Sequence, residues 1–311
     1  MRTAALKKSD LDTKPLAKPV LKWAGGKTQL LPTLSRYYPK ELGSSIRKYI
    51  EPFFGGGAVF FDLYNSGLID EAILVDSNAE LIVLYRTIKE QPHQIIEALS
   101  KLQKKNAAMN EQERELFFYE TRENFNLNRK EKYARPDPLR AAQIVFLNRT
   151  CFNGLFRVNS KQHFNVPHGH YKNPRILDEV NIHAVSAAFQ IADIVHGDFN
   201  AVSKVATNQH FVYFDPPYKP LSKTSSFTAY SGLFDDNHQM RLAEAFKALD
   251  SKGVCQMLSN SDPFTASGDD FFDRLYDGFN INRVEARRMI NSNATKRGEI
   301  SELLITNYDQ N

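Results

Sequence analysis

The chain has 311 residues, of which 42% are hydrophobic and 24% charged, and 40 lysines and arginines against 36 aspartates and glutamates give a net charge of +4. This balance is typical of a globular protein that can bury a core. No apolar stretch is long enough to span a membrane, and the net charge alone is too small to indicate a nucleic-acid partner.

The cysteines and the N-terminus indicate a cytoplasmic protein. Cys151 and Cys255 lie far apart and form no metal-binding or redox pattern, which fits a reducing compartment. Residues 1–18 contain scattered lysines and lack the apolar core of a secretory signal. We therefore expect a disordered leader over these residues.

The first ordered motif is Leu21-Lys22-Trp23-Ala24-Gly25-Gly26-Lys27. Its end imitates a phosphate-binding loop, but that loop needs a glycine where Leu21 stands, so we reject it. Two glycines beside the only tryptophan fit close approach of a ligand to the backbone, with an indole wall. The alternative is a plain glycine turn before a helix that starts near Thr28.

Residues 49–76 resemble the first unit of a doubly wound sheet. A strand over residues 49–54 leads through Gly55-Gly56-Gly57 into a helix, and a second strand ends in Asp76. An acid at the end of a second strand typically binds ribose hydroxyls, yet the dinucleotide fingerprint is missing. S-adenosylmethionine has a ribose and no pyrophosphate, so it fits this pattern. Asp76 is also a candidate cap for the next helix.

A helical block interrupts the alternation of strands and helices. Helices are predicted over residues 81–89, 92–103, 111–125 and 138–147, and the alternation resumes near Gln190. We therefore expect an α/β catalytic domain, residues 19–85 and 185–311, with an inserted subdomain, residues 86–184.

Residues 138–177 contain no acidic residue, although basic and aromatic residues are frequent there. Within them, residues 152–167 are predicted to form a hairpin that turns near Asn159. A basic ribbon with interleaved aromatic side chains suits a groove of duplex DNA, and the alternative is a solvated basic face. His163, His168 and His170 have no thiolate or carboxylate beside them, so no metal site is expected.

The chemistry is expected at Asp215-Pro216-Pro217-Tyr218. This motif follows a buried strand, which must end where the prolines begin because proline cannot continue a central strand. Asp215 and the Pro216 carbonyl can accept hydrogen bonds from a planar amine, and Tyr218 can stack on the attached ring. A strand over residues 191–195 places Asp198 near the same crevice, as a candidate acceptor for an adenine amino group or as a simple turn residue.

The C-terminal third completes the sheet. A strand over residues 254–258, a helix over 269–276 and a strand pair, 281–290 and 300–306, are predicted, and Asp235 or Asp236 can cap the helix that ends near Leu249. The loop between the last two strands contains Lys296 and Arg297, which suit phosphate contacts.

Several of these motifs, in this order, resemble the Dam family of DNA adenine-N6 methyltransferases, which methylate GATC and belong to the class alpha amino-methyltransferases. The matching stretches are Leu21 to Lys27, Glu51 to Gly57, Asp76 with Asn78, Leu147-Asn148-Arg149, Phe152 to Leu155, Arg157, Phe164 to Pro167, Asp215 to Tyr218, and Ser226 to Tyr230. The resemblance runs from about Leu21 to Leu304. It implies a Rossmann-like sheet that binds S-adenosylmethionine, with a target-recognition insert.

By this resemblance, the residues around S-adenosylmethionine are Trp23, Ala24, Gly25, Lys27, Glu51, Pro52, Phe53, Gly55, Gly57, Asp76, Asp198 and Asp215. Asp215, Pro216, Pro217 and Tyr218 would hold the flipped adenine. Residues expected at the DNA are Arg149, Phe152, Asn153, Leu155, Arg157, Pro167, His170, Tyr171, Lys296 and Arg297. Arg157 would recognise a guanine, and Phe152 with Asn153 would fill the space left by the flipped base. His170 stands where the family often has arginine, and His168 where it often has an aromatic residue.

The expected function is transfer of a methyl group to adenine N6 in duplex DNA, by base flipping and in GATC. The resemblance implies a monomer without an obligate protein partner, although a restriction endonuclease that acts on the same site is compatible with it. The alternatives are another target sequence, methylation of cytosine N4, or a catalytically silent, cofactor-sensing DNA-binding protein. The intact Asp-Pro-Pro-Tyr motif argues against a silent protein.

Overall fold

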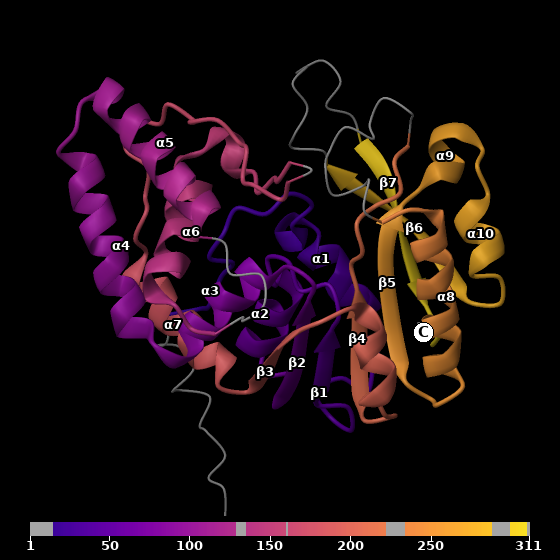
Figure 1. The fold of residues 1–311 in the computed structure, drawn as a ribbon. Helices are drawn as coiled ribbons and strands as arrows, with labels where there is room; N and C mark the ends of the chain where they lie inside the picture. Colours follow the sequence, from indigo (N-terminus) through magenta and orange to yellow (C-terminus); the bar gives the residue numbers. More distant parts are fainter. Residues whose placement is uncertain (1–14, 129–134, 160, 222–233, 288–298, 310–311) are drawn as a thin grey trace, which may run out of the picture.

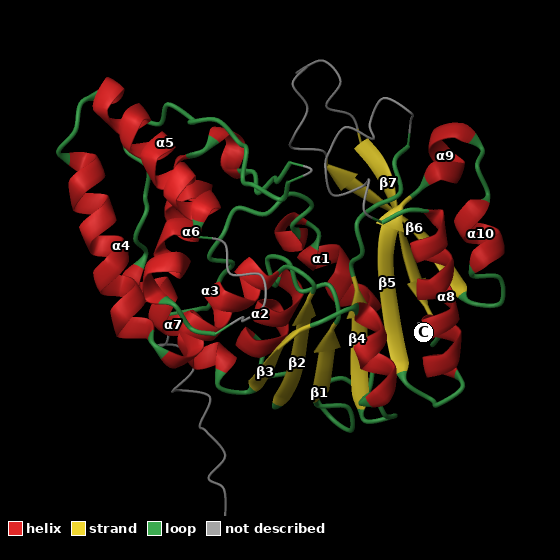
Figure 2. Cartoon of the chain, in the orientation of Figure 1, coloured by secondary structure: helices red, strands yellow, loops and turns green. Residues whose placement is uncertain are grey.

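The protein is built around one seven-stranded sheet, as the computed structural model shows for residues 15–128, 135–159, 161–221, 234–287 and 299–309 (Figures 1 and 2). The strand order is β3-β2-β1-β4-β5-β7-β6. The strands are β1 Lys48–Glu51, β2 Glu71–Asp76, β3 Ala192–His196, β4 His210–Phe214, β5 Cys255–Ser261, β6 Asn280–Arg287 and β7 Glu299–Thr306. Strands β1 to β5 are parallel, and β7 lies antiparallel between β5 and β6. The predicted mixed α/β sheet is therefore confirmed.

The two faces of the sheet are separated by the alternation of side chains along each strand. On one face, Tyr49 and Phe211 join the core beneath helices α2 to α7. On the other, Ile50 and Val212 join the core beneath α8 and α10. Because both faces are covered, the parallel strands are continuous apolar runs, which is why the sequence reveals them well.

Most helices lie close to their predicted positions, whereas α7 and α9 were not predicted. The helices are α1 Leu31–Leu34, α2 Ala58–Asn65, α3 Ala79–Glu90, α4 Pro92–Ala107, α5 Glu111–Leu127, α6 Pro138–Thr150, α7 Glu179–Phe189, α8 Asp236–Asp250, α9 Pro263–Ser267 and α10 Phe271–Leu275. Asp235 caps α8, as expected, by accepting the His238 amide. The cap of α3 is Asn78 rather than Asp76. The helix expected from Thr28 is only a 3-10 turn followed by α1, which is four residues long.

Helices α4, α5 and α6 form a lobe beside the sheet (Figure 1). Their buried side chains belong to the same hydrophobic core as those of β1 and β2. A buried ion pair between Arg140 of α6 and Glu80 of α3 also joins the lobe to the sheet layer. The proposed insert is thus continuous in packing with the catalytic part of the chain.

The hairpin expected over residues 152–167 does reverse near Asn159, where the Asn159 amide donates to the His163 carbonyl at 2.9 Å and the Asn165 amide to the Arg157 carbonyl at 3.1 Å, but it is not a pair of regular strands. Only single antiparallel bridges occur, Val158 with Phe164 and, just outside it, Cys151 with His168. Phe152–Gly154 forms a 3-10 turn in which Asn153 has φ 55° and Gly154 has φ 64°. Residues with a left-handed backbone cannot extend a strand. We call residues 152–167 the recognition arm, and Ser160 within them lies outside the described residues.

No helix in the described ranges is long and apolar enough to cross a membrane.

Candidate active site

The strand order reverses between β1 and β4, and ligands of open α/β sheets bind at such a point, outside the carboxyl ends of the strands. Glu51 ends β1, and Asp215 directly follows β4. These two acids come from segments far apart in the sequence. The topology therefore places the predicted motifs at one crevice.

Asp215 is held by a cation and a hydroxyl. The Lys27 ammonium lies 2.8 Å from Asp215 Oδ1, and the same oxygen accepts a hydrogen bond from Ser259 Oγ at 3.0 Å. Lys27 is 5% exposed, and its ammonium also donates to the Gly25 carbonyl at 2.8 Å. The pair between lysine and aspartate orients the carboxylate, and it connects the Trp-Ala-Gly-Gly-Lys motif directly to the Asp-Pro-Pro-Tyr motif.

Tyr218 presents a fixed aromatic ring beside Asp215. Its hydroxyl donates to Glu302 Oε2 on β7 at 2.7 Å, and the Lys27 ammonium lies 4.5 Å from the ring centroid. Burial, followed by the charges of Glu302 and Asp215, raises the pKa of Tyr218 well above its usual value. The ring is therefore neutral and its plane is anchored at the hydroxyl end, as a stacking platform requires.

Glu51 is a buried acid at the carboxyl end of β1, and it is 3% exposed. Burial is the main reason why its pKa lies well above the usual value, and the nearby Asp215 raises it further. The Tyr49 hydroxyl donates to Glu51 Oε2 at 2.9 Å and acts in the opposite direction. A cation bound in the crevice would stabilise the ionised form of this acid.

The glycine turn after β1 is crowded against aromatic rings. A Cβ on Gly55 would lie 2.8 Å from Trp23 Nε1, and one on Gly57 would lie 2.4 Å from the Phe54 ring. Both glycines have positive φ, 47° and 71°. Asp76 fixes the turn by accepting the Gly55 amide at 2.8 Å. Only glycine fits this backbone, because a Cβ on Gly55 or Gly57 would collide with Trp23 or Phe54.

This turn meets the requirements of S-adenosylmethionine. The Trp23 indole packs on Gly55, Asp76 ends β2 beside it, and the buried Glu51 suits a cationic ligand. Burial raises the pKa of Asp76, which still has lone pairs for a hydroxyl donor. The described residues contain no group of three or more metal-binding side chains.

The remaining candidates of the cofactor set lie around this turn. Pro52 is buried, Ala24 is exposed, and the Phe53 ring stacks on Phe199 with centroids 5.4 Å apart. Asp198 precedes Phe199 and accepts the Asn200 amide, and the Arg241 guanidinium lies 3.6 Å from it. The structure therefore brings the Asp198 segment beside Phe53, although strand β3 is at the far edge of the sheet.

The recognition arm exposes several of the residues expected at DNA. Phe152 is 52% exposed, and Asn153 and Pro167 are exposed too. Arg157 donates from Nε to Asn165 Oδ1 at 2.9 Å, which fixes the direction of its guanidinium. Leu155 is half-buried. The arm is anchored on α5 by Asn126, whose amide group both accepts from and donates to the backbone of Phe164.

Residues just beyond the arm differ in their exposure. The Tyr171 ring lies beneath the Lys22 ammonium, 4.8 Å from its centroid. His170 is exposed, with Nδ1 at 3.6 Å from Glu111. His168 is buried against Phe118, and burial lowers its pKa, with His170 as the second cause.

One residue of the predicted DNA set points away from this surface, and others lie outside the described residues. Arg149 points to the N-terminal segment, where it donates to the Val20 carbonyl at 2.5 Å. Lys296, Arg297 and the motif from Ser226 to Tyr230 lie outside the described residues.

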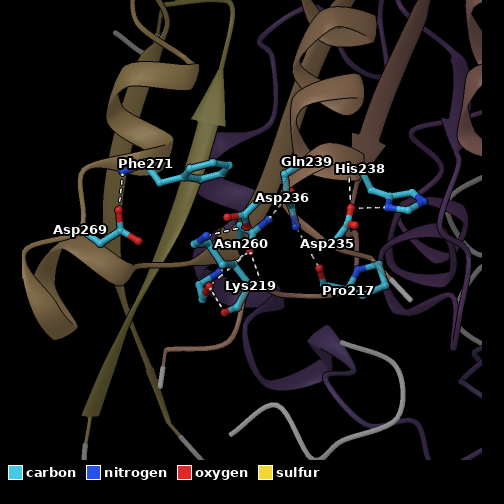
Figure 3. Close-up of polar contacts among 10 residues, drawn as sticks. Pro217, Lys219, Asp235, Asp236, His238, Gln239, Asn260, Asp269 and Phe271 are labelled. Atoms are coloured by element: carbon cyan, nitrogen blue, oxygen red, sulfur yellow. Dashed lines mark hydrogen bonds and ion pairs between the residues drawn. The ribbon is translucent and has the colours of Figure 1, made fainter. Parts of the chain in front are cut away.

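Sequence reasoning missed the polar side chains that support the motifs. Asn148 binds both the amide and the carbonyl of Lys22 and also the Gly154 carbonyl. Gln239 of α8 and Asn260 of β5 support the loop after Asp215 (Figure 3). The polar run Ser259-Asn260-Ser261 at the end of an apolar strand was the available signal.

Comparison with known proteins identifies relatives over most of the chain. Residues 23–290 match the family described as D12 class N6 adenine-specific DNA methyltransferase. The chain is 48% identical to the Type II methyltransferase M.MjaIII of Methanocaldococcus jannaschii, over 94% of this chain and 99% of that protein. It is 42% identical to the Type II methyltransferase M1.LlaDCHI of Lactococcus lactis, over 94% and 95%. It is 34% identical to the DNA adenine methylase of Escherichia coli K12, over 91% and 93%.

Proposed function

Because the chain belongs to the D12 class of N6 adenine-specific DNA methyltransferases, we propose that it transfers the methyl group of S-adenosylmethionine to N6 of a flipped adenine in duplex DNA, within GATC. That it is an adenine-specific DNA methyltransferase follows from the family. The cofactor, the flipping, the target sequence and the roles of single residues are our proposal.

One observation carries the proposal most directly: Asp215 and the Tyr218 ring lie together at the switch point, and the Lys27 ammonium contacts both. The Lys27 ammonium donates to Asp215 and lies over the ring, and a planar amine stacked on Tyr218 would use the same carboxylate. Binding of adenine therefore requires Lys27 to leave this position. The ammonium must also leave because positive charge develops on N6 as the reaction proceeds.

Bound S-adenosylmethionine supplies a methyl group on a sulfonium. The chain's own residues prepare the amine. Asp215 and the Pro216 carbonyl accept hydrogen bonds from its two N–H groups. This favours a pyramidal nitrogen whose lone pair points at the methyl group. Both acceptors bind more strongly as N6 becomes positive, so they stabilise the transition state more than the ground state. Tyr218 offsets part of the few kcal/mol that flipping costs, since it stacks on the extruded base.

The residues that surround the glycine turn are proposed to hold the cofactor. Asp76 would accept a ribose hydroxyl, Trp23 would cover the ligand, and Glu51 would face its positive charge. Asp198, exposed beside Phe53, would accept the adenine amino group. The burial of Glu51 and the position of the Trp23 indole against Gly55 support this assignment.

The recognition arm is proposed to bind the DNA. Arg157 would donate to a guanine, and Phe152 with Asn153 would fill the gap in the base stack. The motif resemblance to the Dam family supports GATC. The exposed His170 and the higher identity to the two Type II methyltransferases favour, as the second candidate, an adenine target in another sequence. We propose a monomer in either case, as the family resemblance implies.

The test is methyl transfer from labelled S-adenosylmethionine to two duplexes that differ only in GATC or GTAC. We expect label at adenine N6 in the first duplex alone. The Asp215→Ala variant should bind the cofactor and lose nearly all turnover. Equal labelling of both duplexes would refute the GATC assignment and leave the chemistry standing. Label on neither duplex, despite tight DNA binding, would favour the silent sensor.

A further inference from the structure

Strand β5 extends beyond its neighbour β4 at the active site. The last register pair of the two is Phe214 with Leu258, because the prolines that follow Asp215 cannot continue a ladder. On its other edge, β5 still pairs with β7 as far as Ser261 with Glu302. The last three residues of β5 therefore lie beside the catalytic loop (residues 215–219) instead of beside a strand.

These three side chains bind both ends of the catalytic loop. Ser259 Oγ donates to Asp215 Oδ1 at 3.0 Å, at the start of the loop. At its end, Ser261 Oγ donates to the Lys219 carbonyl at 2.7 Å, and Asn260 Oδ1 accepts the Lys219 amide at 3.2 Å. The antiparallel strand β7 thus lengthens β5 into a support for the loop.

The middle of the loop is held from helix α8 (Figure 3). Asn260 Nδ2 donates to Gln239 Oε1 at 3.2 Å, and Gln239 Nε2 donates to the Pro217 carbonyl at 3.2 Å. Asn260 is 0% and Gln239 1% exposed. Two buried amides in series therefore connect the end of β5 to the centre of the motif, and each one fixes the orientation of the other.

In this arrangement the two proline carbonyls differ in their hydrogen bonding. Gln239 occupies the Pro217 carbonyl, whereas no hydrogen bond within the described part of the chain uses the Pro216 carbonyl. Neither proline has an amide hydrogen that could fix the loop by itself. We infer that Gln239 and Asn260 are positioning residues, which turn the Pro216 carbonyl and the Tyr218 ring toward the target amine.

The inference rests on the proposed function, since it assigns the two amides to the transfer step. It differs from a purely structural role in one respect. Loss of the Gln239 donor should lower kcat because the acceptor pair around N6 is misplaced, while the affinity for DNA and cofactor is unchanged. A displacement of about 1 Å in such a constellation lowers a rate by roughly 100-fold.

A matched pair of variants tests this. Gln239→Met removes the donor to Pro217 and nearly keeps the side-chain volume. Gln256→Met is the control, because Gln256 of β5 is also a buried glutamine, 0% exposed, and donates to the Phe246 carbonyl of α8 at 3.0 Å, remote from the loop. For both variants, we would measure kcat and KM with the preferred duplex, the dissociation constant of S-adenosylhomocysteine, and the thermal unfolding midpoint.

We expect Gln239→Met to lose roughly 10- to 100-fold in kcat with KM and cofactor affinity unchanged. Gln256→Met should keep kcat at a similar loss of thermal stability. Equal kcat for the two variants would overturn the inference. If Gln239→Met does not fold, Asn260→Ser tests the same connection, because serine is too short to reach Gln239, and wild-type kcat in that variant would refute it. A wild-type enzyme that labels no adenine would refute the proposed function instead.

Discussion

At the scale of one residue, the buried carboxyl group of Glu51 destabilises the fold, although the residue belongs to the proposed cofactor site. Its carboxyl group is buried at the end of β1, and burial raises its pKa well above the usual value. Folding of the protein without ligand therefore favours the protonated form of this acid. A cationic ligand favours the ionised form, so the same burial is useful only when the site is filled.

The Glu51→Gln variant should make this conflict measurable. The folded protein binds the Glu51 proton more tightly than the unfolded chain, so this group lowers the free energy of unfolding as pH rises from the ordinary glutamate range toward the raised pKa. In the variant this contribution is absent. Urea denaturation without cofactor, at several pH values from 5 to 8, should show the variant gaining on the wild type as pH rises.

The matched control is Glu244→Gln, an exposed glutamate on α8 that removes the same charge. A constant difference in unfolding free energy between wild type and Glu51→Gln across this pH range would contradict the role of burial. We also expect Glu51→Gln to bind S-adenosylmethionine more weakly, which a calorimetric titration would measure.

At this scale, the direction of individual side chains could not be predicted from the sequence. The resemblance places Lys27 near a cofactor, but periodicity and spacing could not predict its ion pair with Asp215, because that contact depends on how two distant segments meet at the sheet edge. Arg149 belongs to the basic segment by composition, yet its guanidinium is turned inward to the Val20 carbonyl. Composition counts charges and does not give their orientation.

At the scale of an element, helix α2 begins and ends with glycines of similar conformation. Gly57 is its N-cap with φ 71°, and Gly67, just beyond the C-cap, has φ 66°. Their surroundings differ, because a Cβ on Gly57 would collide with the Phe54 ring and one on Gly67 would meet nothing within 4 Å. The N-terminal end of α2 is thus crowded by the Phe54 ring of the core, and its C-terminal end is open.

Gly57→Ala and Gly67→Ala therefore separate backbone strain from crowding. Each substitution should lower the free energy of unfolding by about 1–2 kcal/mol, because alanine replaces glycine in the left-handed region. Gly57→Ala should lose a further ~1–3 kcal/mol because the Phe54 ring must move. Urea denaturation of both variants against the wild type measures the difference, and equal losses would show that Phe54 moves aside freely.

Elements were predictable where their apolar periodicity was strong. The parallel strands and helices α3 to α6 and α8 lie within a few residues of their expected ranges, because each buries a regular face. Helix α7 was not predicted. The recognition arm reverses near Asn159 as predicted, but the 3-10 turn at its start, where Asn153 has a positive φ, was not predicted, because that conformation depends on local packing. The polar support of the catalytic loop was missed because it joins α8, β5 and the loop, which no local pattern relates.

At the scale of the whole molecule, the net charge of +4 is small, and its placement decides how DNA is approached. The exposed Lys161 lies in the recognition arm, within a stretch of the sequence that has no acidic residue. Lys101 lies on α4, and this helix is at the outer side of the helical lobe in Figure 1. The Lys101 ammonium pairs with the Glu97 carboxylate at 2.6 Å. The two lysines have the same charge in different electrostatic surroundings.

We therefore expect Lys161→Ala and Lys101→Ala to differ in how DNA binding depends on salt. A lysine that neutralises one phosphate changes the slope of log K against log salt by about one. Lys161→Ala should lose this increment for specific and nonspecific duplexes alike, since phosphate contacts do not depend on the sequence. Fluorescence anisotropy between 50 and 200 mM salt would measure the slopes. If both variants reduced the slope equally, attraction by the total charge would explain binding, and the recognition arm would lose its assigned place at the DNA.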